Sequence, residues 1–422
     1  MKIAVIGGGL AGLAAAWLLS KRHTVTLFER HAQPGFIASS VAVPAGAGTV
    51  RVDMPLRVFY RGYYPTLTRL YDALGVATEP VSYATTFTNP DGRAFFRWRN
   101  LRLGGLSYPY VLPHDLISRR ARRIAGAALA FGGLARRAAA RGELAGQSIG
   151  EFVARHHLAP EFVDGLLLPA VATIATCTLE DARAYPADVV AGYLAAGVSR
   201  ESVRRATLGA DDVAARLLAG IGSVQCSAGV QAVAADAQGV AVHRQGRQGG
   251  QGQDSERFDH VVLATQANQA LALWPGASAD EAAALAGFRY RALEVVMHRD
   301  EALMPVRKRD WSAVNARVGD ALDRPESTIW VNAVQPALRR EGPVFQTVHP
   351  QREPRADRVI ARARFERPLV DAGSQRALAA LQRLQAAPGR RVWLCGSYVH
   401  AGVPLLEGAV HSAYAVAAAI SA

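Results

Sequence analysis

The sequence predicts an α/β protein that begins with a Rossmann-like dinucleotide-binding unit. An apolar run at residues 2–6 leads directly into a glycine-rich turn, and an alanine-rich stretch with the period of a buried helix follows to Leu19. A second apolar run at 24–28 then ends at an acidic residue. The length of 422 residues leaves room for a second domain, because domains usually hold roughly 100–200 residues.

The glycine-rich turn is predicted to bind a pyrophosphate. Gly7, Gly9 and Gly12 have the G-x-G-x-x-G spacing. The first glycine permits the tight turn, the second lets the backbone approach the pyrophosphate, and the third lets helix and strand pack closely. The N-terminus of the helix adds free N–H groups and the positive end of its dipole.

An acidic residue ends the second strand of this unit. Glu29 follows the run Thr24–Phe28 and is placed to accept hydrogen bonds from both ribose hydroxyls of a dinucleotide. The alternative is a glycine turn in an α/β protein that binds no cofactor. The pattern alone suits NAD and FAD equally.

The composition excludes several classes of protein. Half of the residues are hydrophobic, which excludes global disorder. The three cysteines, Cys177, Cys226 and Cys395, have neither the spacing of a disulfide framework nor that of a metal site. No signal peptide and no apolar run long enough to span a bilayer is evident. We therefore expect a cytoplasmic protein, with peripheral contact to the inner membrane as a further possibility.

The formal charge of +13 comes almost entirely from arginine, since lysine occurs only at Lys2, Lys21 and Lys308. This excess reflects either a GC-rich genome or attraction to an anionic partner, such as nucleic acid, a lipid surface or an acidic substrate. The arginines are not interleaved with aromatic residues and no nucleic-acid-binding module is evident, so we expect no nucleic-acid partner.

The C-terminal segment predicts a second glycine turn that feeds a second helix. Residues 391–397 indicate a buried strand ending at Gly396 and Ser397, and an alanine-rich helix follows the run Pro404–Val410. Such a helix N-terminus offers N–H donors to the pyrimidine carbonyl of a flavin, where negative charge develops on reduction.

The two glycine turns together resemble the amine-oxidase-type FAD-dependent oxidoreductase superfamily, which includes monoamine oxidases, protoporphyrinogen oxidases and phytoene desaturases. The resemblance is strongest to a bacterial branch of NAD/FAD-binding proteins. It rests on Leu394-Cys-Gly-Ser and Leu406-Glu-Gly-Ala-Val, and less specifically on Tyr64-Pro-Thr-Leu, Ser148-Ile-Gly-Glu-Phe and His298-Arg-Asp.

This resemblance implies an FAD-binding domain of the Rossmann-like GR2 type and a discontinuous α+β substrate domain. The FAD-binding domain would comprise residues 1–85, 211–285 and 386–422, and the substrate domain 86–210 and 286–385. The implied FAD contacts are Gly7, Gly9, Leu10, Ala11, Gly12, Glu29, Arg30, Val230 (backbone to adenine), Gly396, Ser397 and Leu406. The segment 244–257, rich in Gln and Gly, is expected to be an exposed hairpin loop.

Three positions depart from the pattern of the superfamily. A Gly-Gly pair reads Gly35-Phe36, an Asp-x-Gly reads Asp53-Met-Pro55, and Ser397 replaces an acidic residue. Phe36 and Pro55 are bulkier than glycine where backbone approaches the cofactor, so a flavin-free binding protein is an open alternative.

The implied activity is FAD-dependent dehydrogenation or oxygenation of a hydrophobic substrate, including a fatty acyl chain or other lipid. A flavin amine oxidase is the alternative. The superfamily's amine oxidases often place a lysine near the flavin, whereas the three lysines here lie in the nucleotide-binding unit and in the charged run Arg307–Arg309. The positive charge also disfavours a cationic substrate.

No catalytic side chain is evident from the sequence. Tyr60, Tyr63 and Tyr64 are candidates for pocket or core, and core packing is favoured. His349 and His400 are interpreted as structural, and Cys395 as a core residue rather than a flavin attachment point.

The segment 115–143 is basic and amphipathic. Seven arginines flank the apolar stretch Ile124–Ala135, with no acidic residue between Asp115 and Glu143. The segment is either an interfacial helix with its arginines toward anionic headgroups or a pair of core-facing helices with solvated arginines.

Overall fold

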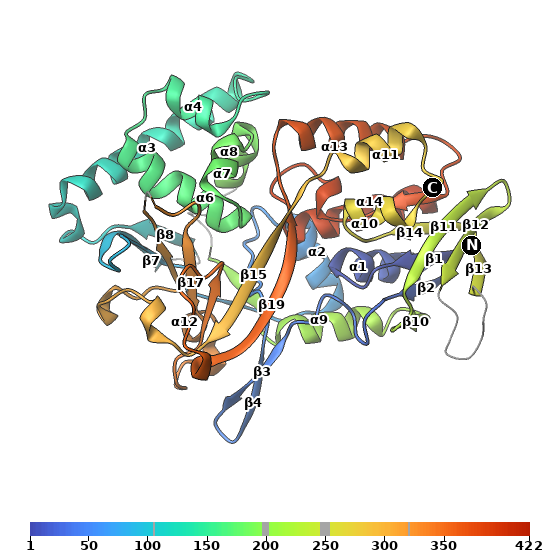
Figure 1. The fold of residues 1–422 in the computed structure, drawn as a ribbon, viewed down its shortest axis with the longest axis horizontal. Coiled ribbons are helices and arrows are strands. Elements are labelled where there is room, and N and C mark those ends of the chain that lie inside the picture. Colours follow the sequence, from blue (N-terminus) through green and yellow to red (C-terminus); the bar gives the residue numbers. More distant parts are fainter. Residues whose placement is uncertain (104–105, 196–201, 245–253, 320) are drawn as a thin grey trace.

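The computed structural model describes residues 1–103, 106–195, 202–244, 254–319 and 321–422. Figure 1 shows two lobes, one built around α1, β1 and α14 and the other around α3, β7 and β17, with the long strands β15 and β19 running between them. The mixed α/β class, with a Rossmann-like domain and a sheet-rich second part, confirms the predicted fold.

The first lobe contains a five-stranded parallel sheet in the order β10-β2-β1-β14-β20. Alternate residues of β1 point to opposite faces: Ile3 and Val5 pack with α1 and α14, whereas Ala4 and Ile6 pack with α10 and a small antiparallel sheet. The elements are β1 (Lys2–Ile6), α1 (Leu10–Leu19), β2 (Thr24–Phe28), β10 (Ser223–Gln225), β14 (His260–Leu263), α10 (Ala267–Leu273), β20 (Val392–Leu394) and α14 (Leu406–Ser421).

The small antiparallel sheet consists of β11 (Val230–Asp236), β12 (Gly239–Arg244) and β13 (Asp254–Phe258). The predicted loop 244–257 is therefore too long at both ends. Arg244 and Asp254 pair across β12 and β13, and residues 245–253 lie outside the described residues. The alternation of polar and apolar residues in β13 is too weak to identify a strand from the sequence.

Helices α11 (Ala279–Ala286) and α13 (Ala372–Gln385) complete this lobe. Leu378 and Leu381 of α13 are buried in the same core as Leu263 of β14. Helix α13 therefore packs with the nucleotide-binding sheet, whereas the sequence assigned residues 286–385 to the substrate domain. Helices α2 (Pro65–Leu74) and α9 (Gly209–Leu218) pack near α14 and α1.

The second lobe contains an eight-stranded sheet in the order β19-β15-β18-β17-β16-β6-β7-β8. All neighbours are antiparallel except β6 and β16. The strands are β6 (Thr85–Thr88), β7 (Ala94–Leu103), β8 (Leu106–Tyr110), β15 (Tyr290–His298), β16 (Val314–Arg317), β17 (Glu326–Trp330), β18 (Phe345–Val348) and β19 (Val359–Pro368). Two distant stretches of chain thus share one sheet.

Helices cover one end of this sheet, and short pairs of strands complete the fold. The helical segments are η1 (Asp115–Ile117), α3 (Arg119–Ala140), α4 (Ile149–Arg155), α5 (Pro160–Phe162), η2 (Val163–Leu167), α6 (Leu168–Ala175), α7 (Leu179–Ala184), α8 (Ala187–Ala195), η3 (Glu301–Leu303), η4 (Lys308–Asp310), α12 (Val331–Val334), η5 (Pro336–Leu338) and η6 (Ala356–Arg358). The short pairs are β3 (Val41–Ala45) with β4 (Gly48–Val52), and β5 (Thr78–Pro80) with β9 (Arg204–Ala206).

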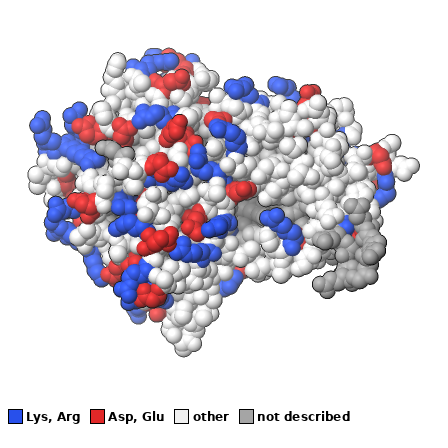
Figure 2. Space-filling view, viewed as in Figure 1, with Lys and Arg blue, Asp and Glu red and all other residues white. Residues whose placement is uncertain are grey.

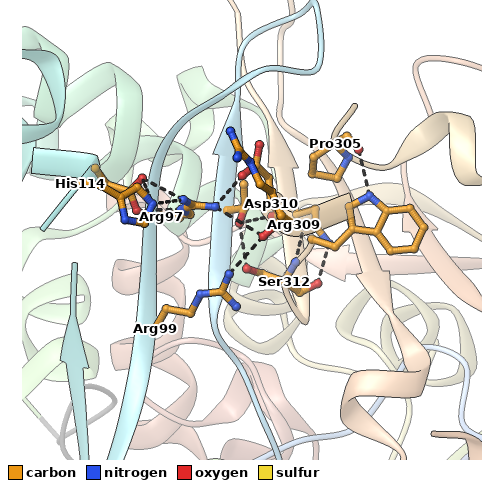
Figure 3. A network of polar contacts seen from close by, with 11 residues as sticks. Arg97, Arg99, His114, Pro305, Arg309, Asp310 and Ser312 are labelled. Atoms are coloured by element: carbon orange, nitrogen blue, oxygen red, sulfur yellow. Dashed lines mark hydrogen bonds and ion pairs between the residues drawn. The ribbon is translucent and has the colours of Figure 1, made fainter. Parts of the chain in front are cut away.

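A buried arginine ties the start of the helical region to the sheet (Figure 3). Arg97 of β7 is 7 % exposed, and its guanidinium donates to Asp115 at 2.7 Å and to Asp310 at 2.5 Å. His114 Nε2 lies 2.7 Å from a third guanidinium nitrogen. One side chain therefore joins β7, η1 and η4.

Candidate cofactor site

The glycine turn between β1 and α1 contains two glycines that the protein itself requires. Gly7 has φ +109°, and a Cβ atom there would lie 2.7 Å from the carbonyl oxygen of Ala264. A Cβ atom on Gly12 would lie 1.9 Å from the carbonyl oxygen of Gly7. These contacts bring α1 and β14 close to the turn, as the sequence predicted.

Gly9 differs, because nothing in the fold accounts for it. Its φ and ψ of −69° and 174° suit any residue, and an added Cβ atom would meet no atom within 4 Å. Gly9 is the N-cap of α1, and no side chain caps this helix. The N–H groups of Leu10 and Ala11 begin the first turn, where helices lack internal acceptors. Open space beside free donors and a positive dipole end fits a phosphate group.

Glu29 directly follows β2 and faces the same turn. It is 5 % exposed, and its Oε2 accepts a hydrogen bond from the Gly8 amide at 2.8 Å. Its Oε1 accepts from the amide of His31 at 2.8 Å and lies 2.7 Å from the His31 Nδ1 atom. The carboxylate is thus held at the end of the parallel sheet, where a ribose would lie.

The chain after β10 returns to this place. The amide of Ala228 donates to the carbonyl of Glu29 at 2.9 Å, and a Cβ atom on Gly229 would lie 3.9 Å from the Cβ of the exposed Arg30. Val230 follows as the first residue of β11. The adenosine side of the predicted site is therefore assembled from two distant segments.

The C-terminal glycine turn lies beside the first one. The amide of Gly396 donates to Ser412 Oγ at 3.0 Å, and a Cβ atom on Gly396 would lie 2.8 Å from the Tyr398 ring. Ser397 begins the short helix η7 (Ser397–Val399) against the first turn of α14, which Leu406 starts. Cys395 lies between the two turns, with its Sγ 3.8 Å from the carbonyl oxygen of Ala11.

Comparisons with known proteins agree with this geometry. Residues 5–74 match a family model described as an NAD(P)-binding Rossmann-like domain. The structure is similar to cyclohexylamine oxidase from Brevibacterium oxydans IH-35A, with 16 % identity, 100 % of this chain and 98 % of that chain covered, and a TM-score of 0.67. The chain therefore has the same overall fold as this oxidase.

Two further solved structures share this fold over their whole length. A fatty acid isomerase from P. acnes that produces CLA has 16 % identity and a TM-score of 0.65, with 100 % of this chain and 98 % of that chain covered. An oxidoreductase from Methanosarcina mazei has 14 % identity and a TM-score of 0.62, with 99 % of each chain covered. No curated protein matches the sequence. The predicted resemblance is thus confirmed at the level of the fold.

The fold brings ten of the eleven predicted contact residues to the carboxyl edge of the parallel sheet or to the helices that start there, and Val230 starts β11 of the small antiparallel sheet. Their individual contacts with FAD stay predictions. The residues are Gly7, Gly9, Leu10, Ala11, Gly12, Glu29, Arg30, Val230, Gly396, Ser397 and Leu406.

The departures from the superfamily pattern have structural partners. Phe36 is buried under Arg57, whose guanidinium lies 4.4 Å from the ring and donates to the Phe36 carbonyl at 2.5 Å. The Asp53 carboxylate accepts a hydrogen bond from the amide of Ala210, and the backbone carbonyl of Asp53 accepts one from the side chain of Gln346. Phe36 thus packs with protein around it, and the open space at Gly9 is left free.

The three adjacent tyrosines divide between core and junction. Tyr60 and Tyr64 are buried, as the favoured interpretation predicted. Tyr63 is half-buried, and its hydroxyl accepts a hydrogen bond from the amide of Val403 at 2.8 Å. It therefore joins this segment to the loop before α14.

The three lysines have partners near the protein surface. Lys2 and Lys308 pair with Glu256 and Glu301, and Lys21 lies over the ring of Trp17. That no lysine lies beside a bound flavin stays a prediction. His349 contacts Arg324 in the second lobe, away from the glycine turns.

Two other expectations concern the C-terminal turn. His400 stacks on His411 with ring centroids 4.1 Å apart, and burial lowers the pKa of His400 to about 4. His400 is therefore neutral near pH 7. Cys395 is fully buried, and burial raises the pKa of its thiol to about 12, in agreement with a core role.

The helical part of the second lobe forms an open, mainly apolar pocket of about 950 Å³. Its walls are mostly Ala, Gly, Leu and Phe side chains of α3, η2, α6 and α8, with Trp98 from β7. Arg136 and Asp188 are the charged residues that line it. The opposite face of α8 carries Tyr193, whose ring contacts those of Tyr60 and Tyr63.

The basic helix α3 packs inward. Ile124, Phe131, Ala135 and Ala138 are buried in the large core, which agrees with the core-facing interpretation of its apolar residues. Figure 2 shows that charged side chains of both signs are interspersed over this lobe, whereas the same face of the nucleotide-binding lobe is largely uncharged. In the described part of the chain no helix is long and apolar enough to cross a membrane.

Sequence reasoning missed three residues near the junction of the lobes: Arg57, Arg367 and Glu407. Glu407 belongs to a motif that the sequence identified, but its partners lie 340 residues away in the chain. Arg57 and Arg367 were two among many arginines, and only their neighbours in the folded structure distinguish them. Of the three residues, only Glu407 lies in a motif from which the sequence could have singled it out.

Proposed function

We propose that this protein is an FAD-dependent oxidoreductase that dehydrogenates or oxygenates a hydrophobic substrate. The observation that carries the proposal is Gly9, a glycine that neither backbone conformation nor packing requires. Its open space lies beside the free donors of α1 and near the carboxylate of Glu29. A dinucleotide explains all three features together.

Bound FAD would supply a hydride acceptor. The residues of this chain have binding and positioning roles around it. The turn Gly7–Gly12 would donate backbone hydrogen bonds to the pyrophosphate, Glu29 would accept hydrogen bonds from the ribose hydroxyls, and the amides from Leu406 onward would serve as donors to the pyrimidine ring. The buried side chains of the Tyr60–Tyr64 segment exclude water from the junction of the two lobes.

A hydrophobic substrate is favoured by two features. The cavity of about 950 Å³ is lined mainly by apolar side chains, and ligand pockets of this size and character hold apolar molecules. The similar structure from P. acnes is that of a fatty acid isomerase that produces CLA. We propose a fatty acyl chain or another lipid as the substrate.

A flavin amine oxidase is the second candidate. The similarity to cyclohexylamine oxidase favours it. Against it stand the three surface lysines and the charge of +13, which would repel a cationic amine. A flavin-free binding protein is the third candidate, and the space at Gly9 speaks against it.

We also propose contact with an anionic bilayer through the outward stripe of α3. Arg122, Leu129 and Arg136 recur every seven residues, so they share one side of the helix; all three are exposed, and Arg136 also lines the apolar cavity. Leu129 is 81 % exposed, and Ile117 in the neighbouring η1 is 77 % exposed. Arginines beside exposed apolar side chains are typical of surfaces that bind acidic headgroups.

The visible spectrum of the purified protein tests the proposed function. Flavin absorption near about 450 nm at one FAD per chain is expected. Folded protein that stays colourless after incubation with FAD would contradict both enzyme candidates. Turnover of fatty acids or of primary amines, followed by reduction of the bound flavin without oxygen, then separates the first candidate from the second.

A further inference from the structure

The open pocket between α3 and α8 has an apolar floor and an exposed rim. Phe131, Phe162 and Leu167 line the pocket and are buried. Arg136 and Asp188 line it and are exposed. Its volume of about 950 Å³ lies at the upper end of the range of roughly 300–1,000 Å³ that ligand pockets occupy. The pocket therefore has room for a long apolar chain whose polar end stays at the surface.

Two helical glycines contribute to the open space of this pocket. Gly132 of α3 and Gly192 of α8 both line it, and neither has a positive φ. A Cβ atom on either glycine would meet no described residue of another element within 4 Å. Glycine inside a helix is less favourable than alanine or leucine. Both positions therefore leave space that a larger side chain would fill without displacing protein atoms.

The two charged residues at the rim differ in their bonding. The Oδ1 atom of Asp188 accepts a hydrogen bond from the amide of Val189 at 2.8 Å, in the first turn of α8. Arg136 has no hydrogen bond or ion pair with any residue that the structure describes. The neighbouring Arg137 is exposed too, and α3 contains no acidic residue. The α3 side of the rim therefore favours an anionic end group on the ligand.

Helix α8 separates the pocket from the tyrosine segment. Gly192 faces the pocket, whereas Tyr193 projects from the opposite side of the helix. The Tyr193 ring lies 5.7 Å from that of Tyr60 and 4.7 Å from that of Tyr63, measured between centroids. Tyr63 in turn accepts a hydrogen bond from the amide of Val403, in the loop before α14. A ligand in the pocket would thus lie one helix away from this junction, at a site separate from the proposed flavin site.

The rim of the pocket lies on the side of α3 that is proposed to face a bilayer. Arg136 belongs both to the rim and to the outward stripe that also contains Arg122 and Leu129. An amphiphile at this surface would keep its charged end at the level of the headgroups while its chain enters the pocket. This arrangement favours a ligand with one anionic end and one long apolar chain.

We propose that the pocket between α3 and α8 binds a long-chain fatty acid, with the chain on the apolar floor and the carboxylate at Arg136. The inference rests on the proposed function only in its choice of an acyl ligand, and it adds a binding site separate from the flavin. A single carboxylate matches the single arginine of the rim that lacks a described partner.

Calorimetric titration of the holoprotein with octanoate, decanoate and dodecanoate tests the chain site. The affinity should rise about fourfold for each CH₂ group that the pocket buries. Gly132→Leu should weaken dodecanoate binding at least tenfold, because the new side chain occupies the pocket. An affinity for dodecanoate equal to that of the wild type would overturn the proposal, as would an affinity that does not depend on chain length.

Gly126→Leu is the matched control for this variant. Gly126 lies in the same helix and also has no neighbour within 4 Å, but it is not part of the pocket lining. Both variants should keep or raise the Tm, since leucine favours a helix more than glycine does. Loss of binding in Gly132→Leu at an unchanged Tm is therefore a loss of the site. Equal loss of binding in Gly126→Leu would contradict the placement in the pocket.

The role of Arg136 is tested with dodecanoate, dodecanol and dodecylamine. Arg136→Gln should weaken dodecanoate binding about threefold to fivefold, the effect of an exposed ion pair, and leave dodecanol binding unchanged. Arg137→Gln, at the exposed neighbouring position outside the pocket lining, is the control and should change neither. Equal effects of the two variants would contradict a specific contact. Tighter binding of dodecylamine than of dodecanoate would assign the rim to a cationic ligand through Asp188 and overturn the proposal.

The absorption spectrum of the bound flavin tests whether the two sites are separate. Saturation of the pocket with dodecanoate should leave this spectrum unchanged, because α8 and the tyrosine rings lie between the sites. A spectral shift that Gly132→Leu abolishes would place the pocket at the flavin and overturn the separate site. A colourless wild-type protein would refute the proposed function, while titration with dodecanoate would still decide whether the pocket binds a fatty acid.

Discussion

The Oε2 atom of Glu407 lies 2.9 Å from the amide nitrogen of Leu67, and its Oε1 lies 3.0 Å from that of Thr66. A buried carboxylate in the first turn of α14 thus caps the N-terminus of α2, which starts at Pro65. The motif Leu406-Glu-Gly-Ala-Val therefore has a structural role beside its proposed place near the flavin. It fixes the tyrosine segment relative to the C-terminal glycine turn.

Replacing Glu407 with glutamine should lower the free energy of unfolding by about 1–2 kcal/mol. The substitution removes the charge that favours the helix N-terminus and turns one acceptor into a donor that faces an N–H group. Denaturation in urea measures the change. Glu143→Gln, at an exposed position, is the control and should change stability by less than about 0.5 kcal/mol. Equal effects of the two variants would refute the capping role.

Substitution of Gly9 should separate cofactor binding from folding. Gly9→Val should abolish FAD retention, because the side chain fills the space proposed for the pyrophosphate, yet the ligand-free protein should unfold as the wild type does. Absorbance of the bound flavin and thermal unfolding measure the two effects. Gly48→Val, another extended position without neighbours within 4 Å, should keep the flavin. A yellow Gly9→Val protein would disprove the assignment of the turn.

Replacing Arg97 with methionine should destabilise the protein by about 3–5 kcal/mol. The change leaves Asp115 and Asp310 in a largely buried place without their cation. The matched variant Arg99→Met changes another arginine of β7, whose guanidinium lies 3.3 Å from the carbonyl oxygen of Arg309. It should lower the free energy of unfolding much less. Urea denaturation distinguishes the two outcomes, and similar losses would show that the pair of carboxylates does not depend on Arg97.

The buried His298 predicts a loss of stability in acid. Burial lowers its pKa from 6.5 to about 4, and its Nδ1 accepts a hydrogen bond from the amide of Asp300. Between these two pKa values the unfolded chain binds a proton that the folded chain does not, so the free energy of unfolding falls as the pH falls. At pH 5 the loss amounts to roughly 2 kcal/mol.

His298→Gln should remove this contribution and flatten the decline in stability between pH 7 and pH 5. Glutamine cannot take up the proton, although it can still donate to Thr347, the partner of His298 at 2.7 Å. The pH profile of His243→Gln, which replaces a half-buried histidine on β12, serves as the comparison. An unchanged slope in His298→Gln would rule out His298 as the group responsible.

Leu129→Asp should weaken binding to vesicles that contain phosphatidylglycerol several-fold, because it adds a negative charge in the outward stripe of α3. Leu208→Asp, which changes an exposed leucine before α9 in the other lobe, should have no effect. Co-sedimentation with the vesicles measures binding. Absence of binding by the wild type at low salt would refute the membrane contact.

Local patterns identified the nucleotide-binding unit correctly. The strand at Lys2–Ile6, the glycine turn, the helix that follows and the strand ending before Glu29 are all present, because each depends on side chains close together in the sequence. The helix of the C-terminal segment and the strand before Gly396 were predicted for the same reason. The strand β13 and the packing of α13 were not, since their burial depends on distant partners.

The sequence by itself determined the fold class and the two glycine turns. Only the tertiary structure distinguished Arg367 from Arg291. Both arginines lie on strands of the same sheet. Arg291 pairs with Asp181, whereas the buried Tyr64 and Tyr185 lie near Arg367. The difference arises because the cost of a buried charge depends on its neighbours in space, and residues 64, 185 and 367 come together only when both lobes are folded.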